Sequence, residues 1–512
     1  MPKKILFFTN SDYGQANIVL ATVYELMLLT KDVEIHIASY EGLRHAALET
    51  NQLALDNSAG TPPLHLVFHR LNGRSQFEAA TGPDVDIFKA YDRPPTFVNA
   101  ARTILCIEGI MQPWSPEEFA DLYQQSLDVL KHVEPDLVVV EPLFTPGLTL
   151  CNHLGVKWIV LSPNTIKDFA VPMQPRVAAL WKYPIVCSGM PFPLPVSLIP
   201  VNIALNLVAA YMLLTGQRVK NAETSLKSRF GESIQLITAN ELGVLKPAPA
   251  GLRILVANTP ELDYPFDILP SHVVPCGPII RASFNLSRMG QSLESWLARG
   301  PTLYVNLGSH LEMNASEAIE MAAAFREFLD RADAAKHFPG RKLQILWKVK
   351  IKGMESWSEA ALSGPERPGD NVYDGIRRLL GKEMEHDQIQ LTSWVTAEPK
   401  SILESGHVIC SVNHGGASSF NEALCAGVPQ LVLPGWADCY DFANRAELLG
   451  IGRWGNKEAK PRWQKDELCE ALTQVVLGPL AEKIQLRSKE LAWKYPESSG
   501  RRMAAEVLLD AC

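Results

Sequence analysis

The chain has 512 residues, of which 47% are hydrophobic and 20% are charged, with a formal net charge of −8 and a pI of about 5.9. This length exceeds one ordinary domain, and the composition is typical of a globular protein with sizeable cores. The acidic balance and the absence of a long basic run exclude nucleic acid as an expected partner. Nine scattered cysteines, none in a CxxC pair, indicate the reduced thiols of a cytoplasmic protein.

The first half of the chain alternates short apolar strands with helical segments. Strands are predicted at residues 5–9, 33–39, 137–140 and 158–161, and helices at 17–29, 119–132 and 148–154. Continuous apolar strands between helices favour a parallel sheet that is covered on both faces. In such doubly wound sheets, ligands bind beyond the carboxyl ends of the strands.

Two apolar stretches of this half bear on membrane association. Residues 5–8 are too few for the core of a signal peptide and are predicted as part of the first strand. Residues 198–214 are about as long as the shortest membrane spans. Because Pro200, Asn202 and Asn206 interrupt this stretch, we interpret it as a buried or acceptor-lining helix, with a weak membrane-surface contact as the alternative.

The second half repeats the alternation. Strands are predicted at residues 302–307, 344–349, 389–391 and 408–412, and a strongly periodic helix at 315–332. The domain junction is placed near Pro275-Cys276-Gly277-Pro278, because this sequence cannot continue a helix or a strand. The polar segment 352–386 is predicted as a long surface insertion.

The segment 412–452 carries the most information about function. The predicted strand 408–412 breaks at Asn413-His414-Gly415-Gly416, and a helix is predicted to begin at Ser418 or Ser419. Glycines let a ligand approach the backbone, and the start of a helix offers unpaired N–H groups to a phosphate. Ser419 and Glu422 also have the spacing of a capping box, so these two side chains are alternatively predicted to cap the helix.

This segment resembles the donor-binding signature of the family 1 glycosyltransferases, which use UDP-sugars. The matching positions are His414, Gly416, Ser419, Glu422, Gly427-Val428-Pro429, Pro434 and Asp438. Cys439 departs from the pattern, because the family has Gln there. Further fragments agree in order: residues 258–262, 276–278, 304–309 and Trp394-Val395. The fine pattern is similar to fungal members.

The resemblance implies an α/β protein of the GT-B fold, with two Rossmann-like doubly wound domains that face a cleft. We predict an acceptor-binding domain at residues 1–280, a linker at 281–295 and a UDP-sugar-binding domain at 296–480. The C-terminal helices at 481–512 are expected to return to the first domain.

The resemblance also implies roles in donor binding. Trp394 would stack on uracil and Val395 would offer backbone groups to the base, although Trp394 is alternatively a core aromatic. His414 would donate a hydrogen bond to the diphosphate and stabilise the leaving group. The other expected phosphate contacts are Gly416, Ser309, Ser418 and Ser419.

The sugar contacts follow from the same resemblance. Glu422 would bind the ribose, and Asp438 would accept hydrogen bonds from the donor sugar in a pocket shaped by Trp436. Glucose is the predicted sugar. Because Cys439 is a poor substitute for the usual Gln, other donor sugars stay open.

The loop 9–17 departs most from the family. Inverting members carry Gly-His after the first strand, with an Asp on a later strand to orient the His. Here Gly14-Gln15 stands in place of Gly-His, and Glu141 stands in place of the Asp. Gly14 is also expected to contribute to donor binding. Because a neutral amide cannot take a proton, we expect a carboxylate to act as base, either Glu141, which is favoured, or Asp12. Alternatively, Glu141 only anchors the loop.

Together these features predict an inverting UDP-sugar glycosyltransferase of secondary metabolism. UDP-glucose is the expected co-substrate, and a small lipophilic natural product, phenol or sterol is the expected acceptor. No metal or other cofactor is expected, because no Asp-x-Asp stands at the donor site. One alternative is a nucleotide-sugar-binding protein without transferase activity, since Gln15 replaces the catalytic His, and a second is a nucleotide-sugar epimerase.

Overall fold

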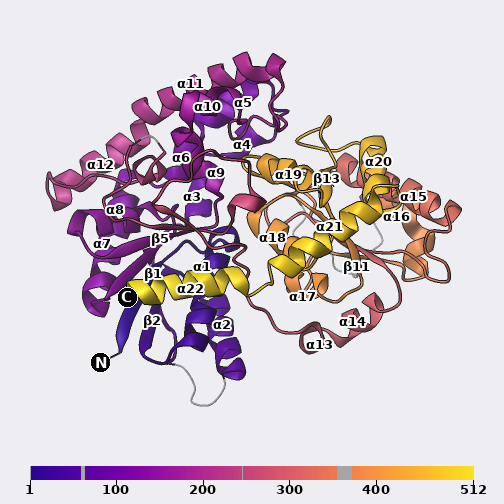
Figure 1. Cartoon of the computed structure of the whole chain (residues 1–512), viewed down its shortest axis with the longest axis horizontal. Helices are drawn as coiled ribbons and strands as arrows, with labels where there is room; N and C mark the ends of the chain where they lie inside the picture. Colours follow the sequence, from indigo (N-terminus) through magenta and orange to yellow (C-terminus); the bar gives the residue numbers. More distant parts are fainter. Residues whose placement is uncertain (1, 59–63, 245, 354–371) are drawn as a thin grey trace. The chain divides into compact units, whose positions relative to one another are not determined.

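The computed structural model describes residues 2–58, 64–244, 246–353 and 372–512. The chain divides into two compact units (Figure 1), and each is described by itself. Unit 1 comprises Met1–Ala282 with Glu497–Cys512, and unit 2 comprises Ser283–Pro496.

Within the described residues, unit 1 contains a seven-stranded parallel sheet with the strand order β3-β2-β1-β4-β5-β6-β7. The strands are β1 (Lys3–Phe8), β2 (Val33–Tyr40), β3 (Val67–Leu71), β4 (Leu137–Val140), β5 (Trp158–Ser162), β6 (Ile254–Val256) and β7 (Val273–Pro275). The direction in which strands are added reverses between β1 and β4. This is the switch point at which doubly wound sheets bind their ligands.

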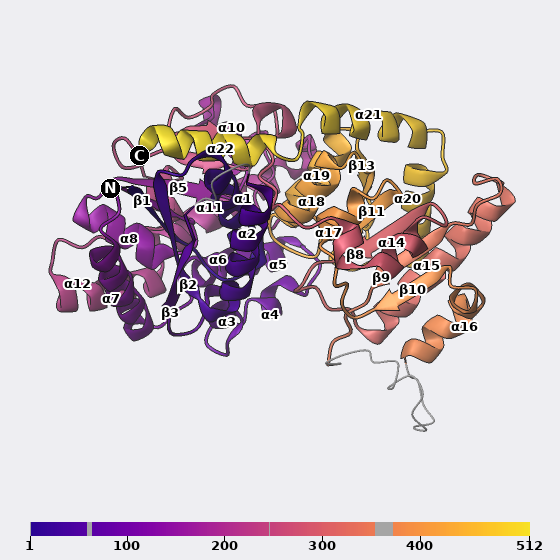
Figure 2. The same ribbon diagram turned by 90° about the horizontal axis from the view of Figure 1, so that it is seen from below.

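The helices of unit 1 cover this sheet. They are α1 (Tyr13–Leu29), α2 (Arg44–Asn57), α3 (Gln76–Thr81), α4 (Phe88–Tyr91), α5 (Phe97–Leu105), α6 (Ile107–Met111), α7 (Pro116–Val133), α8 (Thr145–Leu154), α9 (Ile166–Ala170), α10 (Ala178–Trp181), α11 (Ile199–Thr215), α12 (Gln217–Phe230) and α22 (Ser499–Ala511). α7 packs against α8 and α12, and α1 packs against α2 and α22. Figure 2 shows α22 lying beside α1.

The alternation of side chains along β1 explains how this sheet joins the core. Leu6 and Phe8 are fully buried in one cluster with Phe119 and Tyr123 of α7. Successive residues of a strand point to opposite faces, so every second residue of β1 reaches the helices on this side.

Within its described residues, unit 2 contains a six-stranded parallel sheet with the order β10-β9-β8-β11-β12-β13, which reverses between β8 and β11. The strands are β8 (Thr302–Asn306), β9 (Gln344–Lys348), β10 (Ile389–Thr392), β11 (Val408–Asn413), β12 (Gln430–Val432) and β13 (Gly452–Trp454). The helices are α13 (Leu286–Met289), α14 (Gln291–Leu297), α15 (Ala315–Ala334), α16 (Val372–Glu385), α17 (Pro399–Leu403), α18 (Ala417–Cys425), α19 (Cys439–Leu448), α20 (Lys465–Val476) and α21 (Ala481–Lys494).

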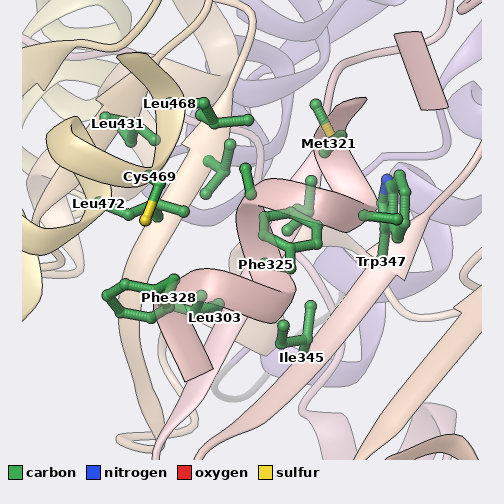
Figure 3. Close-up of a cluster of buried hydrophobic side chains, with 14 of the residues drawn as sticks. Leu303, Met321, Phe325, Phe328, Ile345, Trp347, Leu431, Leu468, Cys469 and Leu472 are labelled. Carbon is green, nitrogen blue, oxygen red and sulfur yellow. The ribbon is translucent and has the colours of Figure 1, made fainter. Parts of the chain in front are cut away.

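The main core of unit 2 lies between the sheet and α15, α16 and α20. Figure 3 shows Phe325 and Phe328 of α15 gathered with Ile345 and Trp347 of β9. The rings of Phe325 and Trp347 meet edge to face, with their centroids 5.1 Å apart. A second cluster on the opposite face joins α14, α17 and α18 around Tyr304 of β8. The predicted doubly wound α/β architecture is confirmed in both units.

The predicted strands agree with the structure to within two residues, although β3, β6, β7 and β13 were not predicted. Three helices begin three or four residues before their predicted starts, whereas the helix predicted at 315–332 begins as predicted at Ala315. The helix predicted at 119–132 begins at Pro116, because Ser115 and Glu118 form a capping box and Pro116 occupies the first turn. The predicted surface insertion at 352–386 is wrong in its C-terminal part, since α16 buries Ile376 and Leu380 in the core. Its residues 354–371 lie outside the described part of the chain.

The two C-terminal helices fall in different units. The last helix, α22, belongs to unit 1, whereas α21 belongs to unit 2, where it packs against α18 and α20.

Candidate active site

The carboxyl ends of five neighbouring strands in unit 2 are in register. In order across the sheet, the aligned residues are Thr392, Lys348, Asn306, Asn413 and Val432. The loops that carry Trp394, Ser309, His414 and Trp436 all leave from this edge. The strand order therefore brings together residues that are far apart in the sequence, at the switch point between β8 and β11.

Two asparagines turn the chain at this switch point in the same way. The side-chain oxygen of Asn306 accepts the N–H of Gly308 at 3.1 Å, and that of Asn413 accepts the N–H of Gly415 at 2.9 Å. Such bonds to the backbone two residues on are typical Asx turns. They end both strands and direct the following loops away from the sheet.

The ring of His414 is held between two glycines. A Cβ atom at Gly308 would lie 2.7 Å from the His414 ring, and one at Gly416 would lie 2.5 Å from its Nε2 atom. Neither glycine can therefore carry a side chain without displacing the imidazole. The ring of Trp436 lies close by, with a centroid distance of 6.1 Å.

The His414 imidazole is neutral at pH 7. Burial lowers its pKa to about 4, with smaller contributions of the same sign from His310 and Lys348. Its Nδ1 atom is buried and has no hydrogen-bond partner among the residues that the structure describes. A buried ring nitrogen without a partner requires an explanation, and a bound ligand group is one.

Two further side chains at this edge, Lys348 and His310, were not predicted from the sequence as site residues. Lys348 lies at the end of β9, donates to the carbonyl of Gly308 at 3.1 Å and sits 4.5 Å from the centre of the Trp394 ring. Burial, and then Lys350, lowers its pKa. Burial also lowers the pKa of His310 to about 4. Their positions just after adjacent strands were the available signal.

The helix that follows His414 begins one residue before the first predicted start and two residues before the second. α18 starts at Ala417 with Gly416 as its N-cap, and no side chain caps it. Ser418 and Ser419 lie inside the first turn, so the alternative that Ser419 and Glu422 form a capping box is wrong. The first N–H groups of this nine-residue helix have no partner within the helix and can bind an anion.

The base-binding candidates differ in exposure. The side chain of Trp394 is 63% exposed, so its interpretation as a core aromatic is wrong. Val395 is partly buried and packs against the cluster around Trp296. Ser309 is exposed, and its carbonyl accepts a hydrogen bond from Lys350 at 3.0 Å.

The sugar-binding candidates lie at the start of α19 and on α18. Asp438 is the N-cap residue of α19, and its side chain does not cap the helix. Cys439 is buried, and its carbonyl oxygen lies so near Gly415 that a Cβ atom there would be 2.9 Å away. Glu422 is half-buried on α18 and lies near Tyr304. Burial is the main cause that raises the pKa of the Tyr304 phenol, and the charge of Glu422 raises it further. The hydrogen bond from Asn306 lowers it.

The switch point of unit 1 has acidic and amide side chains instead. Glu141, directly after β4, is completely buried. One of its oxygens accepts from Asn10 Nδ2 at 2.7 Å and the other from the N–H of Leu143 at 2.8 Å. Burial raises the pKa of Glu141 to about 7, although both hydrogen bonds act in the opposite direction.

The side chain that pairs with Glu141 is Asn10, which follows the first strand and was not among the predicted site residues. Gln15 lies in the first turn of α1 and leaves its buried Oε1 atom without a partner. Gly14 is exposed, and a Cβ atom there would meet nothing within 4 Å, so packing does not require a glycine.

Asp12 differs from Glu141 in having a carboxylate oxygen that accepts no hydrogen bond from the described residues. It is the N-cap residue of α1 but does not cap the helix, and its Oδ2 atom is buried without a partner. Burial raises its pKa to about 6, with a smaller contribution of the same sign from Glu78. Within the described residues, three neighbouring amides also have buried side-chain oxygens without partners: Asn10, Gln15 and Asn17.

Each edge is therefore suited to a different chemistry. The edge of unit 2 offers hydrogen-bond donors and cations, which suit a diphosphate. The edge of unit 1 offers acceptors, including the carboxyl groups of Asp12 and Glu141 with pKa values near neutrality, which suit a hydroxyl that loses its proton. Among the described residues, no group of three or more His, Cys, Asp or Glu side chains could hold a metal ion.

Comparison with known proteins identifies the family. No protein-family model matches the chain. The chain is 34% identical to the glycosyltransferase sdnJ of Sordaria araneosa over 531 residues. The alignment covers 99% of this chain and 98% of that protein. The chain is 23% identical over 590 residues to the erythritol-mannosyl-transferase 1 of Mycosarcoma maydis, covering 99% and 91% of the two chains.

A solved structure shows the same fold. The UDP-glucose:anthocyanidin 3-O-glucosyltransferase in complex with UDP matches with a TM-score of 0.60 at 15% identity, over 100% of this chain and 99% of that chain. The GT-B fold is thus confirmed. The chain belongs to the family 1 UDP-glycosyltransferases and is a glycosyltransferase enzyme. The alternatives of a non-catalytic binding protein and of an epimerase are therefore wrong.

Proposed function

We propose that this enzyme transfers glucose from UDP-glucose to a small lipophilic acceptor, with inversion at the anomeric carbon and without a metal ion. The observation that carries the proposal is the neutral His414, which is held between Gly308 and Gly416 at the start of α18. Lys348 adds a positive charge beside it. The enzyme is expected to act in the cytoplasm.

Several groups share the binding of the donor diphosphate. The start of one exposed helix contributes roughly 0.3–1 kcal/mol to the binding of an anion, which is too little alone. Hydrogen bonds to charged groups contribute about 1.5–3 kcal/mol each, so His414, Ser418 and Ser419 together supply a useful affinity. Uracil stacks on the exposed ring of Trp394.

The proposed reaction is a single displacement. The acceptor oxygen bonds to the anomeric carbon while the bond from that carbon to the UDP oxygen breaks. The acceptor proton passes to Asp12, and the negative charge that develops on UDP is stabilised by His414 and the N–H groups of α18.

Asp12 is the better-supported base of the two carboxylates. Both oxygens of Glu141 already accept hydrogen bonds and the residue is fully buried, so no acceptor can reach it. Asp12 is only partly buried as a residue, its Oδ2 atom accepts no hydrogen bond from the described residues, and its pKa is about 6. Glu141 then acts as a positioning residue that holds Asn10 beside the base.

Two observations support mannose as a second candidate donor sugar. Cys439 replaces the Gln that the family uses at the sugar, and one relative along the whole chain is named as an erythritol-mannosyl-transferase. GDP-mannose and UDP-mannose therefore belong in the donor panel beside UDP-glucose. Erythritol belongs in the acceptor panel for the same reason.

The test is acceptor-dependent release of nucleoside diphosphate, measured for each donor with phenolic, terpenoid, sterol and polyol acceptors. Release from UDP-glucose with a lipophilic acceptor, and a β-linked product, would support the proposal. Release from a mannose donor only, or with erythritol only, would replace the donor or acceptor part of it. A product with retained configuration would refute direct displacement.

A further inference from the structure

Helix α11 of unit 1 has two apolar faces, and only one of them is packed. Asn202, Leu205 and Met212 form the buried face. On the other side, Leu207 is 64% exposed, Tyr211 64% and Leu214 71%. The spacing of these three exposed residues, four and then three positions apart, places them on one stripe of the helix. The helix contains no charged residue from Ile199 to Thr215.

The helix is fixed to the protein and does not form a free membrane span. The segment Val196–Phe230 is long and apolar enough to cross a membrane, and only 17% of its most apolar window is buried. However, the amide of Asn202 accepts the N–H of Ile185 at 2.9 Å and donates to the carbonyl of Tyr183 at 2.9 Å. A Cβ atom at Gly216, where α11 ends, would lie 2.4 Å from Glu108 Oε1.

The helices that neighbour α11 also expose apolar side chains. α5 packs along α11 and exposes Phe97, Val98 and Leu105. α10 packs against α11 as well and exposes Trp181. Figure 1 shows α5 and α10 beside α11. Aliphatic side chains with Tyr and Trp are the set found where proteins meet the interface of a bilayer.

The charges around this surface favour an anionic partner. Residues 176–222 contain four cations, Arg176, Lys182, Arg218 and Lys220, and no Asp or Glu, although the whole chain has a net charge of −8. Asp267 pairs with Lys182 at 3.5 Å, and Glu108 accepts the backbone N–H of Arg218 at 2.8 Å, so two acidic groups offset part of this positive charge. Arg176 and Lys220 are exposed. A second copy is a poor partner, because a two-fold contact would place these like charges opposite each other.

We propose that the apolar face of α11, with its neighbours α5 and α10, docks on the surface of an anionic phospholipid membrane. The helix lies in the plane of the interface and does not cross the bilayer. Leu207, Tyr211 and Leu214 enter the region between headgroups and acyl chains, while the basic residues contact lipid phosphates. The docking does not depend on the identity of the donor or acceptor.

The test is co-sedimentation of the whole protein with vesicles. Phosphatidylcholine vesicles that contain phosphatidylserine should bind it about tenfold or more tightly than phosphatidylcholine alone, and high salt should remove the difference. The triple variant Leu207→Ser, Tyr211→Ser, Leu214→Ser should lower the partition coefficient by at least about tenfold. The matched control is Leu486→Ser with Trp493→Ser, two exposed apolar residues of α21, which should change nothing.

Two further measurements keep the outcome decisive. Thermal unfolding and the circular-dichroism spectrum without vesicles should be unchanged in the triple variant, which shows that it folds. Failure of the wild type to bind either vesicle, or an equal loss in the control variant, would overturn the proposal. Concentration-dependent self-association that the triple variant abolishes would show instead that the face joins two copies.

Discussion

The two switch points of this enzyme share one topology and have opposite chemistry. In both sheets, the loops after two adjacent parallel strands carry the polar residues. In unit 1 these residues are carboxyl and amide groups with oxygens that lack donors, as at Asp12 and Asn10. In unit 2 the loop after β11 carries His414 instead, and Lys348, the last residue of the neighbouring strand β9, adds a lysine near it.

Burial disfavours the charged form of the titratable side chains at both edges. It raises the pKa of Asp12 to about 6 and lowers the pKa of His414 to about 4. One edge therefore keeps a carboxylate that can still take a proton near neutrality, and the other keeps a neutral imidazole that can donate a hydrogen bond. The same sheet topology thus supports acceptor activation in one unit and donor binding in the other.

The largest expected effect comes from Asp12→Asn in unit 1. The amide cannot accept a proton, so kcat should fall by about 10³-fold, within the range typical of a positioned base. For the wild type, kcat/KM should rise with pH through an apparent pKa near 6, because the base must be ionised. This limb should disappear in the variant. A limb that persists unchanged would assign the base elsewhere.

The second effect concerns stability and separates Glu141 from Asp12. The folded protein holds a proton on Glu141 up to a pKa of about 7, whereas an unfolded chain releases it near 4.5. Folding stability therefore falls as pH rises between these values and stays reduced above the folded pKa. Glu141→Gln removes this penalty, and Asn10 can turn its unpaired amide oxygen toward the new NH₂ group.

We expect Glu141→Gln to be more stable than the wild type at pH 8 by up to about 3 kcal/mol, with the difference vanishing near pH 4. Urea unfolding at both pH values measures it. The pH limb of kcat/KM that belongs to Asp12 should remain in this variant. A variant that is less stable at pH 8, or that loses the limb, would contradict the positioning role.

The third effect tests the donor side. His414→Ala removes a hydrogen bond that strengthens as UDP leaves, and kcat should fall by about 10²-fold. Binding of UDP, measured by calorimetry, should weaken less than kcat falls. His414→Asn, which keeps a donor in this place, should recover part of the loss. Equal losses in UDP affinity and in kcat/KM with unchanged kcat would show that His414 contributes to ground-state binding alone.

The smallest effect is expected for Lys348→Ala. Loss of its charge beside the donor should raise KM for the UDP-sugar by about tenfold, and salt should reduce the difference from the wild type. Lys348→Arg should retain most of the affinity. The exposed Lys342 of the same unit is the matched control, and Lys342→Ala should have no effect. A KM that does not change in Lys348→Ala would exclude Lys348 from donor binding.

Local patterns in the sequence predicted much of this protein. Apolar runs between helices predicted most strands of both sheets, and His414 and Gly416 lie between a strand and a helix start, as predicted. These features depend on short-range chemistry: strand burial, the conformational freedom of glycine and the unpaired N–H groups of a helix start. Helix starts were less accurate, because capping depends on side-chain geometry, as at Ser115 and Glu118.

Only the tertiary structure decided which distant residues meet. Asn10 pairs with Glu141 across 131 positions because β1 and β4 are neighbours, and Lys348 reaches Trp394 because β9 lies beside β10. The structure also decided which face of α11 is exposed, since both faces are apolar in the sequence. Apolar periodicity specifies that a segment is buried. Strand order and the packing of neighbouring helices determine which residues it is buried against.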